Sequence, residues 1–171
     1  MRRALGVLLG LILLLPLSLR GQEEGPPPEL RLLDRYVGEW TFQHSSGGSG
    51  THVCKWIGDY FVSCEWRGTN AEGESITGLV EVLGYDAEAE AYTLNRLWGT
   101  GSSDSWRGWV DGDTWTFHNR DAPWGTFSLM VWTEEWPSDG SYTHSYLMKR
   151  SVKGGPWEAT SEASATFTKV R

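Results

Sequence analysis

Basic residues are in the minority in this 171-residue chain, where 15 Lys and Arg stand against 22 Asp and Glu and the formal charge is -7. A protein that follows a phosphate backbone needs a basic surface, so we expect no nucleic-acid partner. Cysteine is scarce, with two residues, and the chain has no recognised zinc-finger spacing. It also lacks a nucleophile elbow, a His-Glu zinc motif and a phosphate-binding glycine loop. No local motif therefore supports catalysis, and an enzyme would have to assemble its site from distant strands.

Long apolar runs are absent except at the N-terminus. Two arginines precede the apolar residues 5–15, and a small residue, Gly21, ends the segment, as in a secretory signal peptide. The apolar run of about 15 residues, broken by Pro16, is shorter than the roughly 20 that span a bilayer. We expect cleavage after Gly21, and no lipid anchor, because Gln22 and not Cys follows.

The mature chain that this cleavage predicts is strongly acidic. Removing three arginines leaves 12 basic against 22 acidic residues, a formal charge of -10, which should repel anionic membrane surfaces. We expect a secreted or periplasmic protein with no membrane partner. Residues 22–28 then form a Pro-rich leader, and residues 29–171 form one domain.

Helical periodicity is confined to one short segment. Residues 29–37 place Leu30, Leu33 and Val37 on one helical face, which predicts a short amphipathic helix. From Trp40 onward, candidate strands of six to ten residues recur between turn signals, and the 11 Trp and 21 Gly suit strands and tight turns. The fold class is therefore all-β: one antiparallel barrel of about nine or ten strands, because so many twisted strands tend to close.

Cys54 and Cys64 lie on one predicted hairpin. With residues 58–60 as its turn, Cys54 faces Cys64 and shares its face with His52. In an oxidising compartment this register predicts a disulfide. Two buried thiols are the alternative, and a metal site using His52 is less favoured because no second cluster of ligands is present.

A second hairpin is predicted around the dipeptide Asp111-Gly112. With those residues as a two-residue turn, Gly108 faces Trp115 and Trp106 faces Phe117. Both hairpins then have one apolar and one mostly polar face, as a barrel wall requires.

The triplet Gly38-Glu39-Trp40, between the helix and the first strand, resembles the Gly-x-Trp opening of lipocalins and other calycins. The wider pattern is similar to an uncharacterised bacterial lipocalin-like family, from about Leu30 to the C-terminus. This resemblance implies a barrel with an internal cavity, closed at one end by Trp40, with Lys169 or Arg171 as the basic residue that packs on the Trp. The resemblance to this family also rests on residues 56–61, 84–86, 92, 98–99 and 108–115.

Arg96 is the first candidate ligand-binding residue. It alternates in phase with Tyr92, Leu94 and Trp98, so an inward face would place a guanidinium among aromatic rings. As in some fatty-acid carriers of the calycin group, it would then bind a carboxylate bidentately. Alternatively Leu97 faces inward and Arg96 is solvated, because buried Arg is uncommon.

His144 is the second candidate. It alternates with Tyr142, Tyr146 and Met148, a stripe that is either core or cavity lining. No cofactor is predicted on this evidence. The alternative is haem ligated by His144, as in small haem-binding barrels related to lipocalins.

Three tryptophans lie in connections that contain Pro or Gly, where loops close over a barrel mouth and contact ligands: Trp124, Trp136 and Trp157. Two carboxylate pairs, Asp111 with Asp113 and Glu134 with Glu135, are interpreted as a turn and a solvated loop, and neither suggests acid–base catalysis.

The leading hypothesis is an extracytoplasmic barrel that binds a small, mostly hydrophobic ligand in its interior. The second hypothesis is an enzyme, an isomerase or hydrolase that uses the same cavity. It predicts turnover that depends on His144 or Arg96. The third is an interaction protein with a filled barrel and exposed tryptophans. The predicted ligand-binding residues are Tyr92, Arg96, Trp98, Trp124, His144 and Tyr146.

Overall fold

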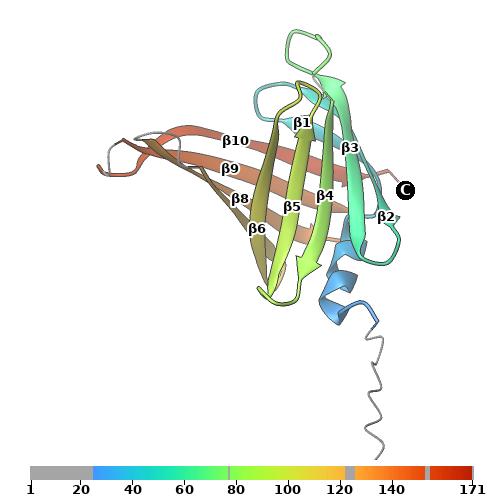
Figure 1. Cartoon of the computed structure of the whole chain (residues 1–171). Coiled ribbons are helices and arrows are strands. Elements are labelled where there is room, and N and C mark those ends of the chain that lie inside the picture. The colour runs from blue at the N-terminus through green and yellow to red at the C-terminus, as the bar shows by residue number, and fades with distance from the viewer. Residues whose placement is uncertain (1–24, 77, 122–125, 153–154, 171) are drawn as a thin grey trace, which may run out of the picture.

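Ten strands follow one another around a closed barrel, preceded by one short helix (Figure 1). The computed structural model describes residues 25–76, 78–121, 126–152 and 155–170. The elements are the 3-10 helix η1 (Pro28–Arg35), β1 (Gly38–His44), β2 (Ser49–Ile57), β3 (Phe61–Thr69), β4 (Leu79–Asp86), β5 (Ala91–Trp98), β6 (Ser103–Asp111), β7 (Thr114–Asp121), β8 (Thr126–Ser138), β9 (Ser141–Val152) and β10 (Glu158–Lys169).

Every strand pairs antiparallel with its neighbour in sequence, and β1 closes the sheet by pairing with β10. Each strand thus pairs with one neighbour on each side along at least part of its length, and β1 covers Ala165–Lys169 of β10. The strands β8, β9 and β10 are the longest, and Figure 1 shows them extending sideways past the others. The predicted all-β barrel is confirmed.

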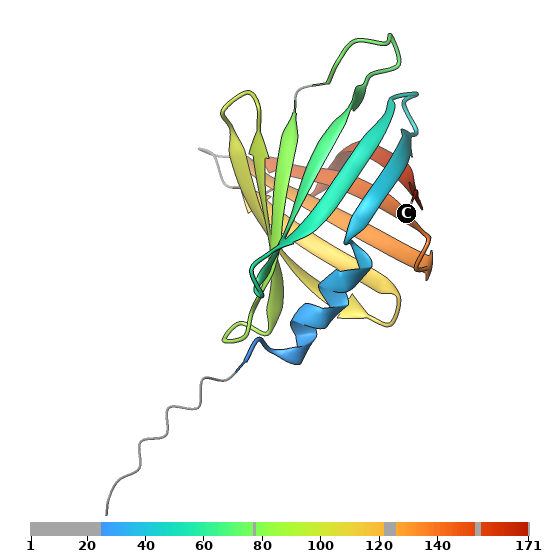
Figure 2. The same ribbon diagram turned by 90° about the vertical axis from the view of Figure 1, so that its right-hand side faces the viewer.

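The helix begins one residue before and ends two residues before the predicted range, residues 29–37. Pro28 supplies a fixed φ at its first position, where no backbone N–H is needed. Leu30 and Leu33 are buried, and the helix lies across one end of the barrel (Figure 2). No helix within the described ranges is long and apolar enough to cross a membrane.

The end of the barrel beside η1 is filled with aromatic rings. Trp40 has no exposed surface, its indole Nε1 donates to the carbonyl oxygen of Tyr36 at 2.7 Å, and its ring packs edge-on against Trp136 and Tyr142. The ammonium of Lys169 lies 5.0 Å from the Trp40 ring centroid. Trp40 therefore belongs to the aromatic packing at this end of the barrel, with Lys169 beside its ring.

The first predicted hairpin is confirmed residue by residue. Cys54 pairs with Cys64, and a disulfide joins them. Both cysteines are buried, so the bridge ties two neighbouring strands from inside the barrel.

The second hairpin has a different register from the predicted one. Asp111 pairs with Thr114, so the turn is Gly112-Asp113, and Gly108 lies opposite Phe117 instead of Trp115. Gly112 takes a left-handed conformation at φ 58°, which favours glycine at this turn position. Because the partner shifts by two residues, the same side chains still face inward.

Candidate functional site

The half of the barrel away from η1 encloses a cavity of about 540 Å³. Its mouth lies at the β1–β2 turn and the β3–β4 connection, which contribute Ser46, Asn70 and Ile76. Most of its wall is aromatic, aliphatic or thioether in character. The main contributors are Phe42, Trp66, Leu79, Trp98, Trp106, Met130, Trp132, Tyr146, Met148 and Ala165. The acidic, basic and imidazole side chains among the lining residues are His44, Glu81, Arg96 and His144. The barrel is thus hollow in this half, which contradicts the filled-barrel hypothesis.

Arg96 points inward, while Leu97 is 52% exposed on the outer face. The interpretation of Arg96 as a solvated residue is therefore wrong. Its guanidinium lies 4.5 Å from the ring centroid of Trp106, 5.1 Å from that of Trp98 and 5.6 Å from that of Trp132. Cation–π attraction and the shelter of three rings offset the cost of placing a charge here.

Asp104 occupies the fork of this guanidinium. The Nε of Arg96 donates to Oδ1 at 2.7 Å and Nη2 donates to Oδ2 at 2.9 Å, and the indole N–H groups of Trp98 and Trp106 donate to the same carboxylate. Although partial burial opposes ionisation, these hydrogen bonds and the charge of Arg96 lower the pKa of Asp104 below its usual value. Asp104 therefore occupies the Nε–Nη2 edge of the guanidinium, one of its two edges for bidentate binding of a carboxylate.

His144 contributes a neutral imidazole to the cavity. Its ring stacks on Trp132 with centroids 3.9 Å apart, and its Nδ1 is buried without a hydrogen-bond partner in the described part of the chain. Burial first, and then the positive charge of Arg96, hold the pKa of His144 well below its usual range. A neutral imidazole offers one N–H donor and one lone pair, so this residue can orient a polar group or ligate a metal centre.

Glu81, which sequence reasoning missed, is a buried carboxylate among the lining residues. Its Oε2 accepts a hydrogen bond from the Trp66 indole at 2.7 Å and lies 3.5 Å from the Nε2 of His52. Its Oε1 has no partner among the described residues. The sequence did indicate that Glu81 faces inward, because it alternates in phase with Leu79 and Leu83, which are both buried.

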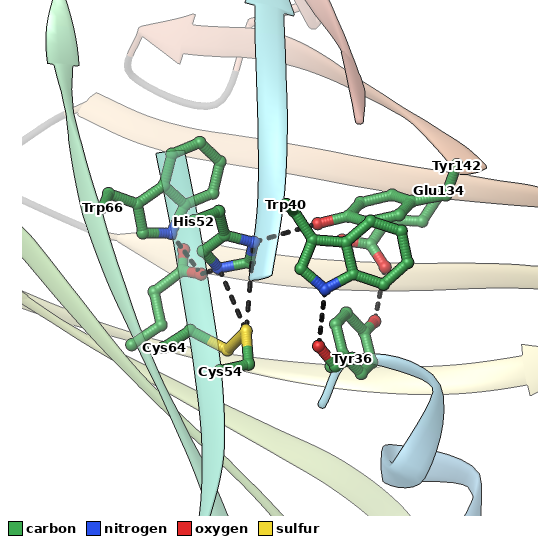
Figure 3. Close-up of a disulfide and its surroundings, with 9 residues drawn as sticks. Tyr36, Trp40, His52, Cys54, Cys64, Trp66, Glu134 and Tyr142 are labelled. Atoms are coloured by element: carbon green, nitrogen blue, oxygen red, sulfur yellow. Dashed lines mark hydrogen bonds and ion pairs between the residues drawn. A yellow bond between two sulfur atoms is a disulfide. The ribbon is translucent and has the colours of Figure 1, made fainter. Parts of the chain in front are cut away.

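His52 lies between the disulfide and Tyr142 of the closed end, as Figure 3 shows, and it is also the neighbour of Glu81 described above. Its Nδ1 lies 3.2 Å from the Tyr142 hydroxyl, and its Nε2 lies 3.5 Å from the Sγ of Cys54. With the imidazole proton on Nε2, the Tyr142 hydroxyl donates to Nδ1 and the N–H points toward Glu81. The ligand atoms of His52, Cys54 and Cys64 lie within 4.8 Å of one another, but both sulfurs are joined in the disulfide and offer no thiolate to a metal.

Glu134 is a second buried carboxyl, outside the cavity and at the closed end. Its interpretation as part of a solvated loop is wrong, because it is 2% exposed on the inner face of β8. The Tyr36 hydroxyl and the indoles of Trp132 and Trp136 donate to it. Burial raises the pKa of Glu134 to about 8, despite the opposing effect of these hydrogen bonds. The group ties η1 to the barrel wall.

Four of the predicted ligand-binding residues line the cavity: Arg96, Trp98, His144 and Tyr146. Tyr92 does not, because it lies at the closed end, where its hydroxyl donates to the carbonyl oxygen of Glu29 and its ring packs on Trp115. Trp124 lies outside the described residues. Position along the strand explains the division, since Tyr92 is the second residue of β5, near η1, and Trp98 is its last residue, at the mouth.

The other two loop tryptophans differ from each other. Trp136 is 1% exposed, and the Arg35 guanidinium lies 5.1 Å from its ring centroid, so it belongs to the closed end and not to a contact surface. Trp157 is 40% exposed, at the start of β10. The turn residue Asp113 accepts a hydrogen bond from Arg35 at 2.8 Å, which agrees with its expected structural role.

Comparison with known proteins finds similarity in structure only. No family model matches the chain, and no curated protein matches it. Three similar solved structures are the S-type phycobiliprotein lyase CPES from Guillardia theta (16% identity, 82% of this chain and 92% of that chain, TM-score 0.53), Rv2717c from M. tuberculosis (12%, 85% and 99%, 0.47) and EF1p2_mFAP2b bound to DFHBI (10%, 83% and 98%, 0.43). The likeness to the lyase supports the fold alone, a closed antiparallel barrel.

Proposed function

We propose that this protein is an extracytoplasmic carrier or receptor that binds a small, mostly hydrophobic molecule inside its barrel. The observation that carries the proposal is the cavity of about 540 Å³, within the usual range for ligand pockets and walled mainly by aromatic and aliphatic side chains. Burial of apolar ligand surface at about 25 cal/mol per Å² supplies the binding energy. Arg96, Trp98, His144 and Tyr146 are the proposed ligand contacts.

The proposed compartment follows from the N-terminal segment and the disulfide. Residues 1–21 carry the three regions of a cleaved signal peptide, and Cys54 and Cys64 are bridged, as suits an oxidising compartment. In this proposal residues 22–28 are a leader, residues 29–171 are the binding domain, and the chain is one of the bacterial lipocalin-like proteins. Amino-terminal sequencing of the protein from its own host should begin at Gln22.

Titration with the fluorophore N-phenylnaphthylamine tests whether the cavity binds ligands. We expect enhanced, saturable fluorescence with the purified protein. Ala165→Phe, which puts a ring into the cavity wall, should abolish it. Thr166→Phe adds the same ring to the exposed face of the same strand and should leave it unchanged. Equal loss in both variants, or no saturable signal in the parent protein, would contradict the proposal.

Haem binding is a second candidate that one observation favours. His144 lies in the cavity wall with its pKa held well below the usual range, and a neutral imidazole is the form that ligates haem iron. Native mass spectrometry with an absorbance scan on protein from its own host separates the candidates. A copurified apolar mass supports the carrier, whereas a strong band near about 400 nm that is lost in His144→Leu supports haem.

A further inference from the structure

Arg96 is the group that would be expected to select an anionic ligand, yet its fork is already occupied. Asp104 accepts from both Nε and Nη2, at 2.7 and 2.9 Å, and the Arg96 and Asp104 side chains are only 13% and 19% exposed. At the Nε–Nη2 edge a ligand carboxylate would have to displace a carboxylate that two indole N–H groups also hold, and at the Nη1–Nη2 edge it would lie beside the negative charge of Asp104. The carboxylate of Asp104 thus neutralises the positive charge of Arg96.

Glu81 leaves the cavity with an acceptor that is not fully used. One oxygen is held by the Trp66 indole, and the other is buried without a partner among the described residues. An unpaired buried acceptor costs free energy until a donor reaches it. Because Arg96 is paired with Asp104 and His144 is neutral, the Oε1 of Glu81 is the acceptor in the deep wall that a ligand donor would satisfy.

The walls favour flat ligands. The rings of Trp66, Trp98, Trp106 and Trp132 all line the cavity. Their faces carry negative electrostatic potential, which attracts cations and the positive edges of aromatic donors. Two independent features, a paired arginine and a half-paired glutamate, therefore disfavour an anion at the same depth of the barrel.

We infer that the cavity selects flat aromatic ligands that carry an amine or hydroxyl donor, which Glu81 accepts, and discriminates against carboxylates. This inference rests on the proposed binding function and gives it a ligand class. It reverses the role that the sequence suggests for Arg96, which here positions Asp104 and the tryptophan rings and does not capture a carboxylate.

Three isosteric probes test the inference by displacement of N-phenylnaphthylamine at neutral pH: naphthylmethylamine, naphthalenemethanol and naphthoic acid. We expect the amine to bind at least about tenfold more tightly than the acid, with the alcohol between them. An acid that binds as tightly as the amine overturns the inference while leaving the binding function intact. Failure of every probe, including the fluorophore itself, overturns both.

Two variants test the residues. Glu81→Gln should remove most of the preference for the amine, whereas Glu65→Gln, the same charge change on the outer face of β3, should not alter it. Asp104→Asn should free the guanidinium and strengthen binding of naphthoic acid by about tenfold. Its control is Asp86→Asn, which breaks the exposed pair with Arg107.

Circular dichroism of each variant shows whether it is folded. The order of the three probes in the parent protein needs no variant, so a misfolded variant does not remove the test. If a folded Asp104→Asn variant does not strengthen binding of the acid, Asp104 is not what blocks anions and the inference is wrong.

Discussion

Burial of Glu134 makes the stability of this protein depend on pH with a sign opposite to that of an ion-paired carboxylate. Burial raises the pKa of this group from 4.5 to about 8. Between these values the folded protein keeps a proton that the unfolded chain has lost. Because the folded state binds more protons, the free energy of unfolding falls as the pH rises from 4.5 to about 8.

His144 has the opposite effect at lower pH. Its pKa is held well below 6.5, chiefly by burial, so below pH 6.5 the unfolded chain binds a proton that the folded protein does not. The free energy of unfolding therefore falls as the pH falls through this range. The slopes from the two groups oppose each other between pH 4.5 and 6.5, and the effect of Glu134 is uncompensated only above pH 6.5.

The size of the effect follows from the two pKa values of Glu134. One proton of difference changes the free energy of unfolding by about 1.4 kcal/mol per pH unit. From pH 6.5 to about 8, and allowing for partial ionisation near the upper limit, the loss is about 1.5 kcal/mol. Glu134→Gln keeps the shape of the protonated carboxyl and should abolish this loss.

Urea unfolding followed by tryptophan fluorescence at both ends of this range measures the loss directly. The matched control is Glu135→Gln, because Glu135 is the next residue along β8 and is exposed. It should retain the loss seen in the parent protein. The reasoning is refuted if Glu134→Gln shows the same loss of stability between these pH values as the parent protein. It is also refuted if this substitution lowers the free energy of unfolding by more than about 3 kcal/mol at every pH, because a cost of that size would mean that the folded protein depends on a buried, ionised carboxylate.

Three further outcomes concern the fold. Trp40→Ala should lower the free energy of unfolding by about 3–5 kcal/mol in urea titrations, because a fully buried indole leaves a large hole at the closed end. Replacing both Cys54 and Cys64 by Ala should cost about 2–3 kcal/mol, the value for a closed loop of ten residues, and reduction of the parent protein should reproduce it. Gly108→Ala should lower the free energy of unfolding by about 1–3 kcal/mol, since the added Cβ would lie 2.4 Å from the buried ring of Phe117. The control Gly78→Ala, where no atom lies within 4 Å of the added Cβ, should be neutral, and equal effects of the two substitutions would contradict this packing.

The alternation of residues along a strand predicted which side chains share a face, but not how deep in the barrel each one lies. Tyr92 and Arg96 lie on the same face of β5, yet the first packs beside η1 and the second lines the cavity. Depth depends on strand tilt and on closure of the sheet, which no local pattern encodes. The shifted hairpin at Gly112 shows the same limit at short range, since Asp111-Gly112 and Gly112-Asp113 are both acceptable turn dipeptides.

The sequence by itself determined the fold class, the short helix before the first strand and the pairing of Cys54 with Cys64. These follow from composition, period-two patterning and one hairpin register, which are local properties of the chain. Only the tertiary structure decided that Arg96 faces inward and is neutralised by Asp104, and that Glu81 and Glu134 are buried. The environment of a charged side chain is set by strands distant in sequence, because the balance between desolvation and pairing depends on every group that closes around it.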